Sequence, residues 1–381
     1  MASRWLSVVL AALALASACG LPATSKTSAQ PAIAIQSPSP TTLGTATAQP
    51  SHPTAEPTQP AVSCIAPGSA SLYQGPRPQT DKASVAFDAV RQETVLLAEV
   101  QAGVFETWTW NGSVWTHKHP VNSPDAQLGI VFDDSESRIV GFGTSADLKQ
   151  PGLQQLPPGE TWTWDGTNWT HESPRTSPPA RRQASLVYDS KRLRVLMMGG
   201  FGRPNESFKE VWSWSDGNWQ LTVPAPDFYV SVPAETAYDT QHDEVVRYFF
   251  PGGYASDPRI VWLFDGKAWR SLSVGPGDLP DSGALGYDSR LGKMLMFGEQ
   301  FSPADKYGQG GAATWRWDGM NWTKLCVGGG PARRFYPVMT YDSNRGRLVL
   351  LGGYTLPAGN PPLVWPQDVW EFDGRQWIQR A

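Results

Sequence analysis

The stretch Trp108-Thr-Trp110-Asn-Gly112-Ser-Val-Trp115 decides the fold, because the chain repeats its pattern five more times. Each copy has a Trp, an aromatic residue two positions later, a glycine turn, and a closing Trp seven residues after the first. The other copies begin at Trp162, Trp212, Trp262, Trp315 and Trp370. Sixteen of the 18 Trp residues belong to these units, so the high Trp content is a repeat signature.

A second pattern precedes each Trp unit. An apolar run ends in Phe-Asp or Tyr-Asp, a turn follows, and a second apolar run ends in most copies at glycine. The aspartates of this pattern are Asp88, Asp133, Asp189, Asp239, Asp288 and Asp342. Equivalent positions recur every 45 to 56 residues or so, which is typical of propeller blades. Five residues after four of these aspartates stands a basic residue, which we expect to pair with the carboxylate across the turn: Arg138, Arg194, Lys293 and Arg347.

Each repeat predicts four antiparallel strands, here called a to d. Strand a ends at the aspartate and strand b at the glycine; strand c carries Trp-x-Trp, and strand d begins at the closing Trp after a tight hairpin turn. Such a blade cannot cover its own apolar faces, whereas six blades arranged radially cover one another. We therefore expect the repeated Trp rings to pack between blades rather than stack on carbohydrate.

The sequence thus predicts an all-β chain whose main domain, residues 63–381, is a six-bladed β-propeller. The repeats span about 84–120, 129–174, 184–224, 234–274, 283–327 and 337–381. Composition agrees, because charged residues are 17% of the chain and 37 Gly and 34 Pro favour short connections over a helical bundle.

Two further patterns resemble kelch repeats. Glycine pairs end several b strands, at Gly199-Gly200, Gly252-Gly253 and Gly352-Gly353, and Pro-Ala-Arg-Arg precedes two a strands, at 179–182 and 331–334. The resemblance covers about residues 84–381 and implies six blades of the galactose oxidase central-domain type. The sequence departs from it at Ala98, which stands in place of a glycine, and at Gly143 and Gly298, which are single.

The N-terminal region predicts export. Residues 1–18 have a positive Arg4, an apolar run and a small-residue end, as in a signal peptide. Ala-Ser-Ala-Cys19 resembles a bacterial lipobox, which implies lipid on Cys19 and a place on the outer face of the membrane, in the cell envelope. The alternative is ordinary cleavage after Ala18 and a secreted protein. Residues 19–62 are rich in Pro, Thr, Ser and Ala and predict a disordered tether.

Charge and cysteine content limit the partners. The net charge of −4 offers no basic surface for nucleic acid. No cysteine or histidine spacing indicates a metal site, and no cofactor is expected. With Cys19 lipidated, Cys64 and Cys326 remain as a pair, for which we expect a disulfide in an oxidising compartment; two unpaired cysteines are the alternative. We expect a monomer.

Three enzyme classes share this architecture. Galactose oxidase uses a copper site with two His, but the five histidines here (His52, His117, His119, His171 and His242) fall in the tether, on outer strands or in a turn. Sialidases carry Asp boxes, and Asp165-Gly166-Thr-Asn-Trp169 differs because Asp and Gly are adjacent. A sialidase-like glycosidase with paired carboxylates and a sialic-acid mutarotase stay as alternatives.

Variable loops indicate where function lies. The a–b and c–d turns are short and uniform, whereas the b–c loops on the opposite face are long and irregular, at 144–160, 201–209, 254–260, 299–313 and 354–368. With the d–a loops they supply the candidate binding residues: Arg181, Arg182, Tyr229, Tyr254, Asp281, Tyr307, Arg333, Arg334 and Tyr336. Aromatic rings beside guanidinium groups suit a glycan or an acidic ligand.

The sequence therefore predicts a binding module, for a glycan or a protein, with no catalytic residue assigned. A carbohydrate-active enzyme and a passive wall component are the alternatives. The four arginines have two readings, since they either contact a ligand or only hold the d–a loops to neighbouring blades. We expect their substitution to leave thermal stability nearly unchanged if binding is their role.

Overall fold

The structure is a computed structural model, and it describes residues 72–80, 82–149, 153–203, 206–223, 235–249, 260–274, 280, 282–299, 312–327, 329–355 and 362–381. The chain divides into two compact units, Met1–Glu56 and Pro57–Ala381. Every described residue belongs to the second unit. The predicted signal peptide, Cys19 and the tether therefore lie outside the described residues, and so does Cys64.

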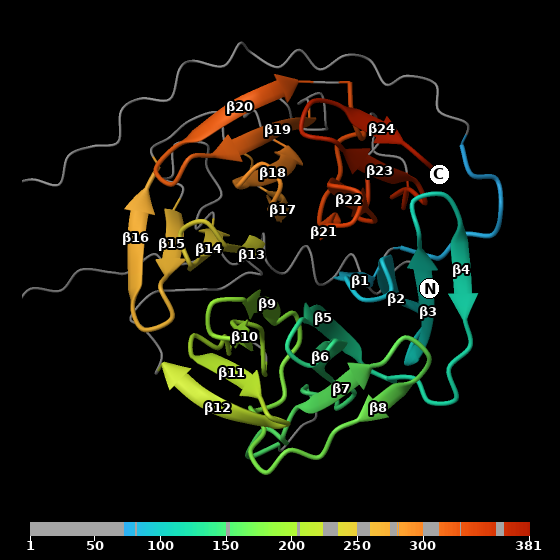
Figure 1. The fold of residues 1–381 in the computed structure, drawn as a ribbon. Coiled ribbons are helices and arrows are strands. Elements are labelled where there is room, and N and C mark those ends of the chain that lie inside the picture. The colour runs from blue at the N-terminus through green and yellow to red at the C-terminus, as the bar shows by residue number, and fades with distance from the viewer. Residues whose placement is uncertain are drawn as a thin grey trace, which may run out of the picture. The chain divides into compact units, whose positions relative to one another are not determined.

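The described residues form 24 strands in six sheets of four (Figure 1). Blade 1 contains β1 (Ala83–Asp88), β2 (Glu93–Gln101), β3 (Val104–Trp110) and β4 (Trp115–Lys118). Blade 2 contains β5 (Gln127–Asp133), β6 (Arg138–Thr144), β7 (Glu160–Trp164) and β8 (Trp169–His171). Blade 3 contains β9 (Ser185–Asp189), β10 (Arg194–Met198), β11 (Val211–Ser215) and β12 (Asn218–Val223).

The second half of the ring repeats this arrangement. Blade 4 contains β13 (Glu235–Asp239), β14 (Glu244–Phe249), β15 (Ile260–Phe264) and β16 (Trp269–Ser273). Blade 5 contains β17 (Ser282–Asp288), β18 (Lys293–Glu299), β19 (Ala312–Trp317) and β20 (Trp322–Val327). Blade 6 contains β21 (Val338–Asp342), β22 (Arg347–Leu351), β23 (Val369–Phe372) and β24 (Trp377–Gln379).

Each sheet is an antiparallel meander in chain order, with strand a innermost (Figure 1). The innermost strands contact one another in the order β1, β5, β9, β13, β17, β21 and back to β1. This closes the ring and confirms the predicted all-β six-bladed propeller. We call the side with the b–c and d–a loops the upper face, and the side with the a–b and c–d turns the lower face.

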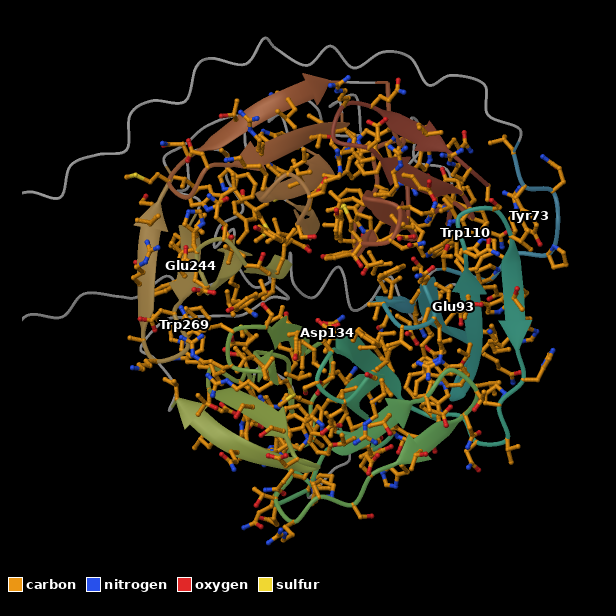
Figure 2. The ribbon with its side chains drawn as sticks, viewed as in Figure 1. Tyr73, Glu93, Trp110, Asp134, Glu244 and Trp269 are labelled. Atoms are coloured by element: carbon orange, nitrogen blue, oxygen red, sulfur yellow. The ribbon has the colours of Figure 1, made fainter. Side chains whose placement is uncertain are left out.

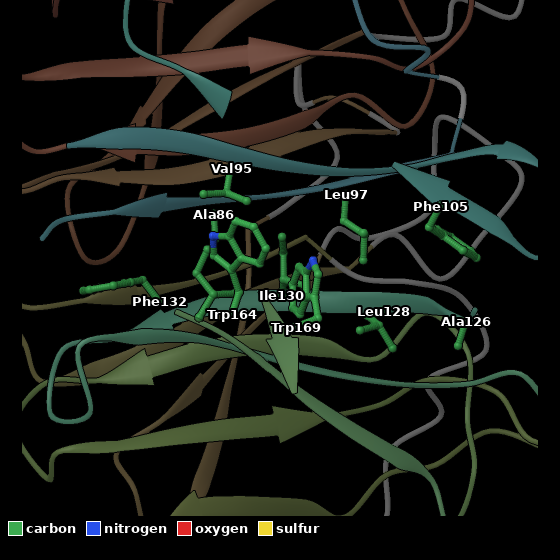
Figure 3. Close-up of a cluster of buried hydrophobic side chains, with 11 residues drawn as sticks. Ala86, Val95, Leu97, Phe105, Ala126, Leu128, Ile130, Phe132, Trp164 and Trp169 are labelled. Atoms are coloured by element: carbon green, nitrogen blue, oxygen red, sulfur yellow. The ribbon is translucent and has the colours of Figure 1, made fainter. Parts of the chain in front are cut away.

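The hydrophobic core lies between blades. At the interface of blades 1 and 2, Ala86, Val95 and Leu97 pack against Leu128, Ile130 and the rings of Trp164 and Trp169 (Figure 3). The closing Trp169 also donates its indole N–H to Thr107 Oγ1 of blade 1, at 2.8 Å. The same bond recurs from Trp219 to Thr161 and from Trp377 to Thr314.

The first Trp of the repeat has a fixed role too. In four blades its indole N–H donates to an acidic side chain two residues earlier: Trp108 to Glu106, Trp162 to Glu160, Trp212 to Glu210, and Trp370 to Asp368. The second and closing Trp rings are almost completely buried in most blades. The repeated Trp residues therefore build the ring, as the sequence predicts.

The lower face carries a second contact between blades. Asp88 is fully buried, and its Oδ2 forms an ion pair with Nη1 of Arg91, three residues later, at 2.8 Å. The Arg91 guanidinium lies against Gly166 in the next blade's hairpin, where the φ of +97° favours glycine and a Cβ would be only 1.9 Å from Arg91 Nε. The same contact, from an a–b turn to the c–d hairpin glycine of the next blade, recurs around the ring. The pairs are Arg192 on Gly266, His242 on Gly319, Arg290 on Gly374, and Arg345 of blade 6 on Gly112 of blade 1.

This arrangement corrects the pairing expected from the sequence. Of the basic residues that stand five positions after an aspartate, Arg194 forms the expected ion pair, with Asp189 at 3.4 Å. Arg138 instead pairs with Glu136 and Glu172, and Arg347 pairs with Asp373. In blades 1, 3 and 6 the arginine three positions after the aspartate pairs with it, because the tight turn folds that residue back over the carboxylate.

The ring closes between blades 6 and 1 without a shared strand, since each sheet contains four consecutive strands. A buried carboxylate joins the two blades instead of a shared strand. Glu371 accepts the indole N–H of Trp110 in blade 1 at 3.1 Å, and it pairs with Arg345 at 2.5 Å and Arg380 at 3.0 Å. The equivalent residues of the other blades are Thr109, Thr163, Ser213, Leu263 and Arg316, so Glu371 is particular to the seam.

The segment 72–80 lies across the same seam. The Tyr73 backbone N–H donates to the Arg380 carbonyl at 2.8 Å, and the Tyr73 ring lies edge-on to Trp110 with centroids 6.1 Å apart (Figure 2). Thr80 Oγ1 donates to the Pro366 carbonyl at 2.8 Å. The lead-in segment therefore ties blade 1 to blade 6.

Replacing Glu371 should open this seam. We expect Glu371→Leu to lower the free energy of unfolding by about 3 kcal/mol, because it leaves the Arg380 guanidinium and the Trp110 indole N–H without their acceptor and removes one of the two carboxylates that pair with Arg345. Glu371→Gln keeps an acceptor for Trp110 and should cost less. Urea unfolding followed by Trp fluorescence measures both, and equal stability of all three proteins would contradict the seam role.

Candidate ligand site on the upper face

Arg181, a predicted binding residue, is fully buried at the upper end of blade 3. Its guanidinium pairs with Glu210 at 2.5 Å, donates to the carbonyls of Pro179 and Gly199, and covers the Phe208 ring. Burial lowers the pKa of Arg181, and the Glu210 carboxylate opposes that shift. The contacts of Arg181 therefore join the d–a loop to the b–c loop of the same blade.

Arg334 has the same role in blade 6. It is fully buried, binds both oxygens of Asp368 at 2.8 and 3.0 Å, and donates to the carbonyls of Ala332 and Gly352. Arg181 is the first arginine of its Pro-Ala-Arg-Arg segment and Arg334 is the second. The two are therefore equivalent by their contacts and not by their positions in the motif. Of the two roles predicted for them, their contacts support loop packing.

The neighbouring arginines differ. Arg182 is exposed and donates to the Ala146 carbonyl at 3.1 Å, while Arg333 lies over the Phe335 ring at 5.4 Å. Tyr229, Tyr254, Asp281 and Tyr307 lie outside the described residues. Cys326 stands opposite Thr314 on β20, but nothing is described of its side chain, so the disulfide with Cys64 stays a prediction.

The paired arginines give a direct test of packing against binding. Arg181→Ala should lower the free energy of unfolding by about 3 kcal/mol, because it leaves the Glu210 carboxylate without its buried partner. The exposed neighbour supplies the control, since Arg182→Ala should change it by less than about 1 kcal/mol. Thermal melts of the two variants measure the difference, and similar melting temperatures would contradict the packing role.

A group of two exposed and two half-buried aromatic residues occupies the upper face of blade 6. The Phe335 and Tyr354 rings stack at 5.0 Å, and Tyr336 lies 6.1 Å from Tyr354. Backbone bonds join Phe335 to Tyr354 and Thr355 to Val364, which places Trp365 at the edge of this small ribbon. Tyr336 is 60% exposed and Trp365 45%. We call Phe335, Tyr336, Tyr354 and Trp365 the aromatic platform.

Tyr336 extends the platform toward the ring axis. Its φ of +51° is in the left-handed region, and so is the φ of +57° at Gln183, which follows the equivalent bridge in blade 3, so this backbone form belongs to the d–a loop. Desolvation and the nearby charge of Glu235, on β13 of blade 4, raise the pKa of the Tyr336 phenol.

Blade 4 carries two charged side chains that the other blades lack. Glu235 begins β13, where the equivalent residues are small or apolar: Ser84, Gly129, Ser185, Ala284 and Val338. Arg247 stands on β14, where the equivalents are Leu96, Gly141, Met197, Met296 and Leu350. Five blades fold without these charges, so the fold itself does not require them.

The surroundings of this pair are unusual. Arg247 is 3% exposed, donates to Ser185 Oγ at 3.3 Å and Thr236 Oγ1 at 3.2 Å, and lies against Gly199. Burial raises the pKa of the Glu235 carboxyl to about 8, although Arg247 and the Gly283 backbone N–H oppose the shift. Burial also lowers the pKa of Arg247 to about 10.

Sequence reasoning predicted Tyr336 but missed Phe335, Tyr354, Trp365, Glu235 and Arg247. Two signals in the sequence point to them. Trp365 is the only Trp between residues 63 and 381 outside the repeated units. Glu235 and Arg247 become visible when the six repeats are aligned on their aspartates and compared position by position. Perturbed titratable groups beside exposed aromatic rings define a candidate ligand site.

Two absences concern only the part of the chain that the structure describes. There, no group of three or more His, Cys, Asp or Glu side chains is placed to hold a metal ion. Within the same residues, no helix has the length and apolar character needed to cross a membrane.

Comparisons with known proteins agree with the fold. No family model and no curated protein matches this sequence. Among solved structures, YjhT is 12% identical with a TM-score of 0.53, covering 81% of this chain and 99% of its own. A mutant of AofleA from Arthrobotrys oligospora is 12% identical with a TM-score of 0.50, covering 79% and 87%.

A fungal lectin from Aleuria aurantia, described as a six-bladed β-propeller with a novel fucose recognition mode, is 11% identical with a TM-score of 0.49 and covers 80% of this chain and 97% of its own. At such identity the likenesses to YjhT and AofleA show the fold alone.

The raised pKa of Glu235 predicts how stability depends on pH. The carboxyl titrates near 4.5 when unfolded and near 8 when folded, so folding takes up a proton between these values. Stability should therefore fall as pH rises from about 5 to 8. Glu235→Gln mimics the protonated acid, and we expect it to melt like the natural protein at pH 5 and at a higher temperature at pH 8.5. Parallel melting temperatures at all pH values would contradict the shift.

Proposed function

We propose that this protein is a carbohydrate-binding propeller whose ligand lies on the upper face, on the aromatic platform of blade 6. The observation that carries the proposal is the contrast between two sets of aromatic rings. Most Trp rings of the repeats pack between and within blades, whereas Tyr336 and Trp365 of the platform stand outside the repeated Trp units and are 60% and 45% exposed. Exposed aromatic clusters on a rigid scaffold are suited to the apolar faces of sugar rings.

The polar groups around the platform support a glycan over an apolar ligand. Arg333 lies against the Phe335 ring, and the phenols of Tyr336 and Tyr354 both donate and accept hydrogen bonds. Sugar hydroxyls need such partners because an unpaired polar group in a site costs binding free energy. The platform therefore combines stacking surface with hydrogen-bonding groups.

The sequence supports the cellular setting within this proposal. The glycine pairs and Pro-Ala-Arg-Arg segments support a kelch-type propeller, and the lipobox-like Ala-Ser-Ala-Cys19 supports export and a lipid anchor at the outer face of the membrane. The tether at 19–62 would then hold the domain away from that surface.

A carbohydrate-active enzyme is the second candidate, and one observation favours it. Glu235 has a pKa near neutrality, which is the property of a general acid or base. Sugar turnover by the domain that is lost in Glu235→Gln would favour catalysis over binding alone.

The binding proposal is tested on a glycan array with the 63–381 domain. Trp365→Ala should weaken binding of the best glycan by about tenfold, because a stacked ring contributes on the order of 1–2 kcal/mol. Met320→Ala is the matched control, since Met320 is 61% exposed on the lower face. Loss of binding in both variants, or in neither, would contradict the platform.

A further inference from the structure

We infer that the lower face carries, between blades 2 and 3, a binding site for an arginine side chain of another protein. The guanidinium of that arginine takes the place of a basic residue that the other five interfaces of the ring have and this interface lacks. The site is independent of the proposed glycan site, which lies on the upper face.

Five of the six interfaces contain a basic side chain that joins an a–b turn to the next blade. It pairs with Oδ2 of the aspartate of its own turn and lies against the c–d hairpin glycine of the next blade. We call this side chain the clasp. The five clasps are Arg91, Arg192, His242, Arg290 and Arg345. Because four of them are arginines, the position is one that a guanidinium fits.

The a–b turn of blade 2 has an acid in place of the clasp. Glu136 stands three residues after Asp133, where blades 1, 3 and 6 have their clasp arginine. The Glu136 carboxylate pairs with Arg138, which also binds Thr163 and Glu172 of its own blade. None of these contacts reaches blade 3.

The carboxylate that a clasp would bind is present and incompletely satisfied. Asp133 is fully buried, and its Oδ1 accepts the backbone N–H groups of Ser135 and Glu136 at 2.9 and 3.3 Å. Among the residues that the structure describes, no donor or cation binds its Oδ2, the oxygen that pairs with the clasp in the other five blades. A buried carboxylate oxygen without a partner is costly, and a charged donor would satisfy it.

The hairpin of blade 3 leaves space where the other hairpins are covered. At the four arginine clasps, a Cβ built on the hairpin glycine would lie 3.0 Å or less from the arginine. At Gly217, the hairpin glycine of blade 3, a Cβ would have nothing within 4 Å. The place beside this hairpin is therefore open to a side chain from outside.

Carboxylates from both blades border this interface. Asp216 is exposed and stands two residues after Trp214, a position that is glycine in the other five hairpins. Asp134 follows Asp133 at the inner end of blade 2 (Figure 2). Burial raises the pKa of the Tyr188 phenol of blade 3, and the charges of Asp133 and Asp134 add to the shift. The negative charge at this interface favours a cationic ligand.

The donor groups favour an organic cation over a metal ion. In the described part of the chain, no three His, Cys, Asp or Glu side chains are placed to hold a metal ion. A guanidinium instead needs only carboxylate oxygens within reach of its planar fork of N–H groups. Free arginine carries an α-carboxylate that the acids of this interface would repel, whereas an arginine within a polypeptide has none. The ligand we assign is therefore an arginine of a partner protein.

The ring supplies a substitution that closes the site. Glu136→Arg gives blade 2 the Asp-x-x-Arg-x-Arg sequence that blades 3 and 6 already have. The new arginine should pair with Asp133 and lie on the hairpin of blade 3. We expect the melting temperature to rise by about 2 °C, because the buried carboxylate gains its partner. A melting temperature below that of the natural protein would contradict the missing clasp.

Binding is measured with N-acetyl-argininamide, which has no carboxylate, and with N-acetyl-citrullinamide, which has a similar shape and no charge. The signals of each probe are followed by NMR during titration with the full chain. We expect the arginine probe to bind about tenfold more tightly than the citrulline probe, since a hydrogen bond to a charged partner is the stronger kind. Glu136→Arg should remove this preference.

Two further variants form a matched pair. Asp216→Asn should weaken binding of the arginine probe about threefold, because it removes one carboxylate beside the site. Asp243→Asn is the control, since it removes the same charge from another lower-face residue with positive φ, where Lys191 already pairs with the carboxylate. It should leave binding unchanged.

Three results overturn the inference. The first is equal binding of the arginine and citrulline probes, or of neither, by the natural protein. The second is an undiminished preference for the arginine probe in Glu136→Arg. The third is an equal loss of binding in Asp216→Asn and Asp243→Asn, which would show attraction to the whole acidic face and not to this site. The third comparison decides the matter even when Glu136→Arg does not fold.

Discussion

A ring of six sheets with no shared strand must close through side chains, and this requirement governs the rest of the structure. Between blades 6 and 1 the closing contact is a buried carboxylate, Glu371, bound by an indole and two guanidiniums. Elsewhere the closing Trp of one blade packs on its neighbour and in three interfaces donates to its Thr. Each blade is stable only when both neighbours are in place, so the scaffold is cooperative and rigid.

Rigidity of this kind separates structural from functional residues. Positions that recur in every blade, such as the fully buried aspartates of the a–b turns and the Trp rings, serve the ring. Positions where one blade departs from the other five are free of that demand. Glu371 departs in order to close the seam, and Arg247 departs to bond Ser185 of blade 3, whereas Trp365 departs and is 45% exposed.

Much of the fold could be predicted from the sequence because repetition amplifies weak local signals. One Trp-x-Trp unit predicts little, while six at regular spacing predict six blades and the place of every hairpin. The partners of side chains were harder to predict. The buried state of Arg181 and Arg334 depends on Glu210 and Asp368, which lie 29 and 34 residues away along the chain. Nothing local distinguishes them from the exposed Arg182.

The candidate site was only partly predictable for the same reason. Long loops and exposed aromatic residues indicated the upper face, and Tyr336 was found there. Glu235 belongs to blade 4 and Tyr336 precedes the first strand of blade 6. The charge of Glu235 contributes to the raised pKa of Tyr336 only because the ring is closed. The shifted pKa of Glu235 arises from burial in the assembled ring, which a linear sequence does not display.

The most direct measurement of the central claim is a crystal structure of the 63–381 domain with the glycan that it binds best on the array. The account predicts that a sugar ring contacts Trp365 or Tyr336 and that no Trp of the six repeats touches the glycan. A sugar stacked on a repeat Trp such as Trp162, or bound on the lower face, would contradict the separation of structural repeats from a functional site that departs from them.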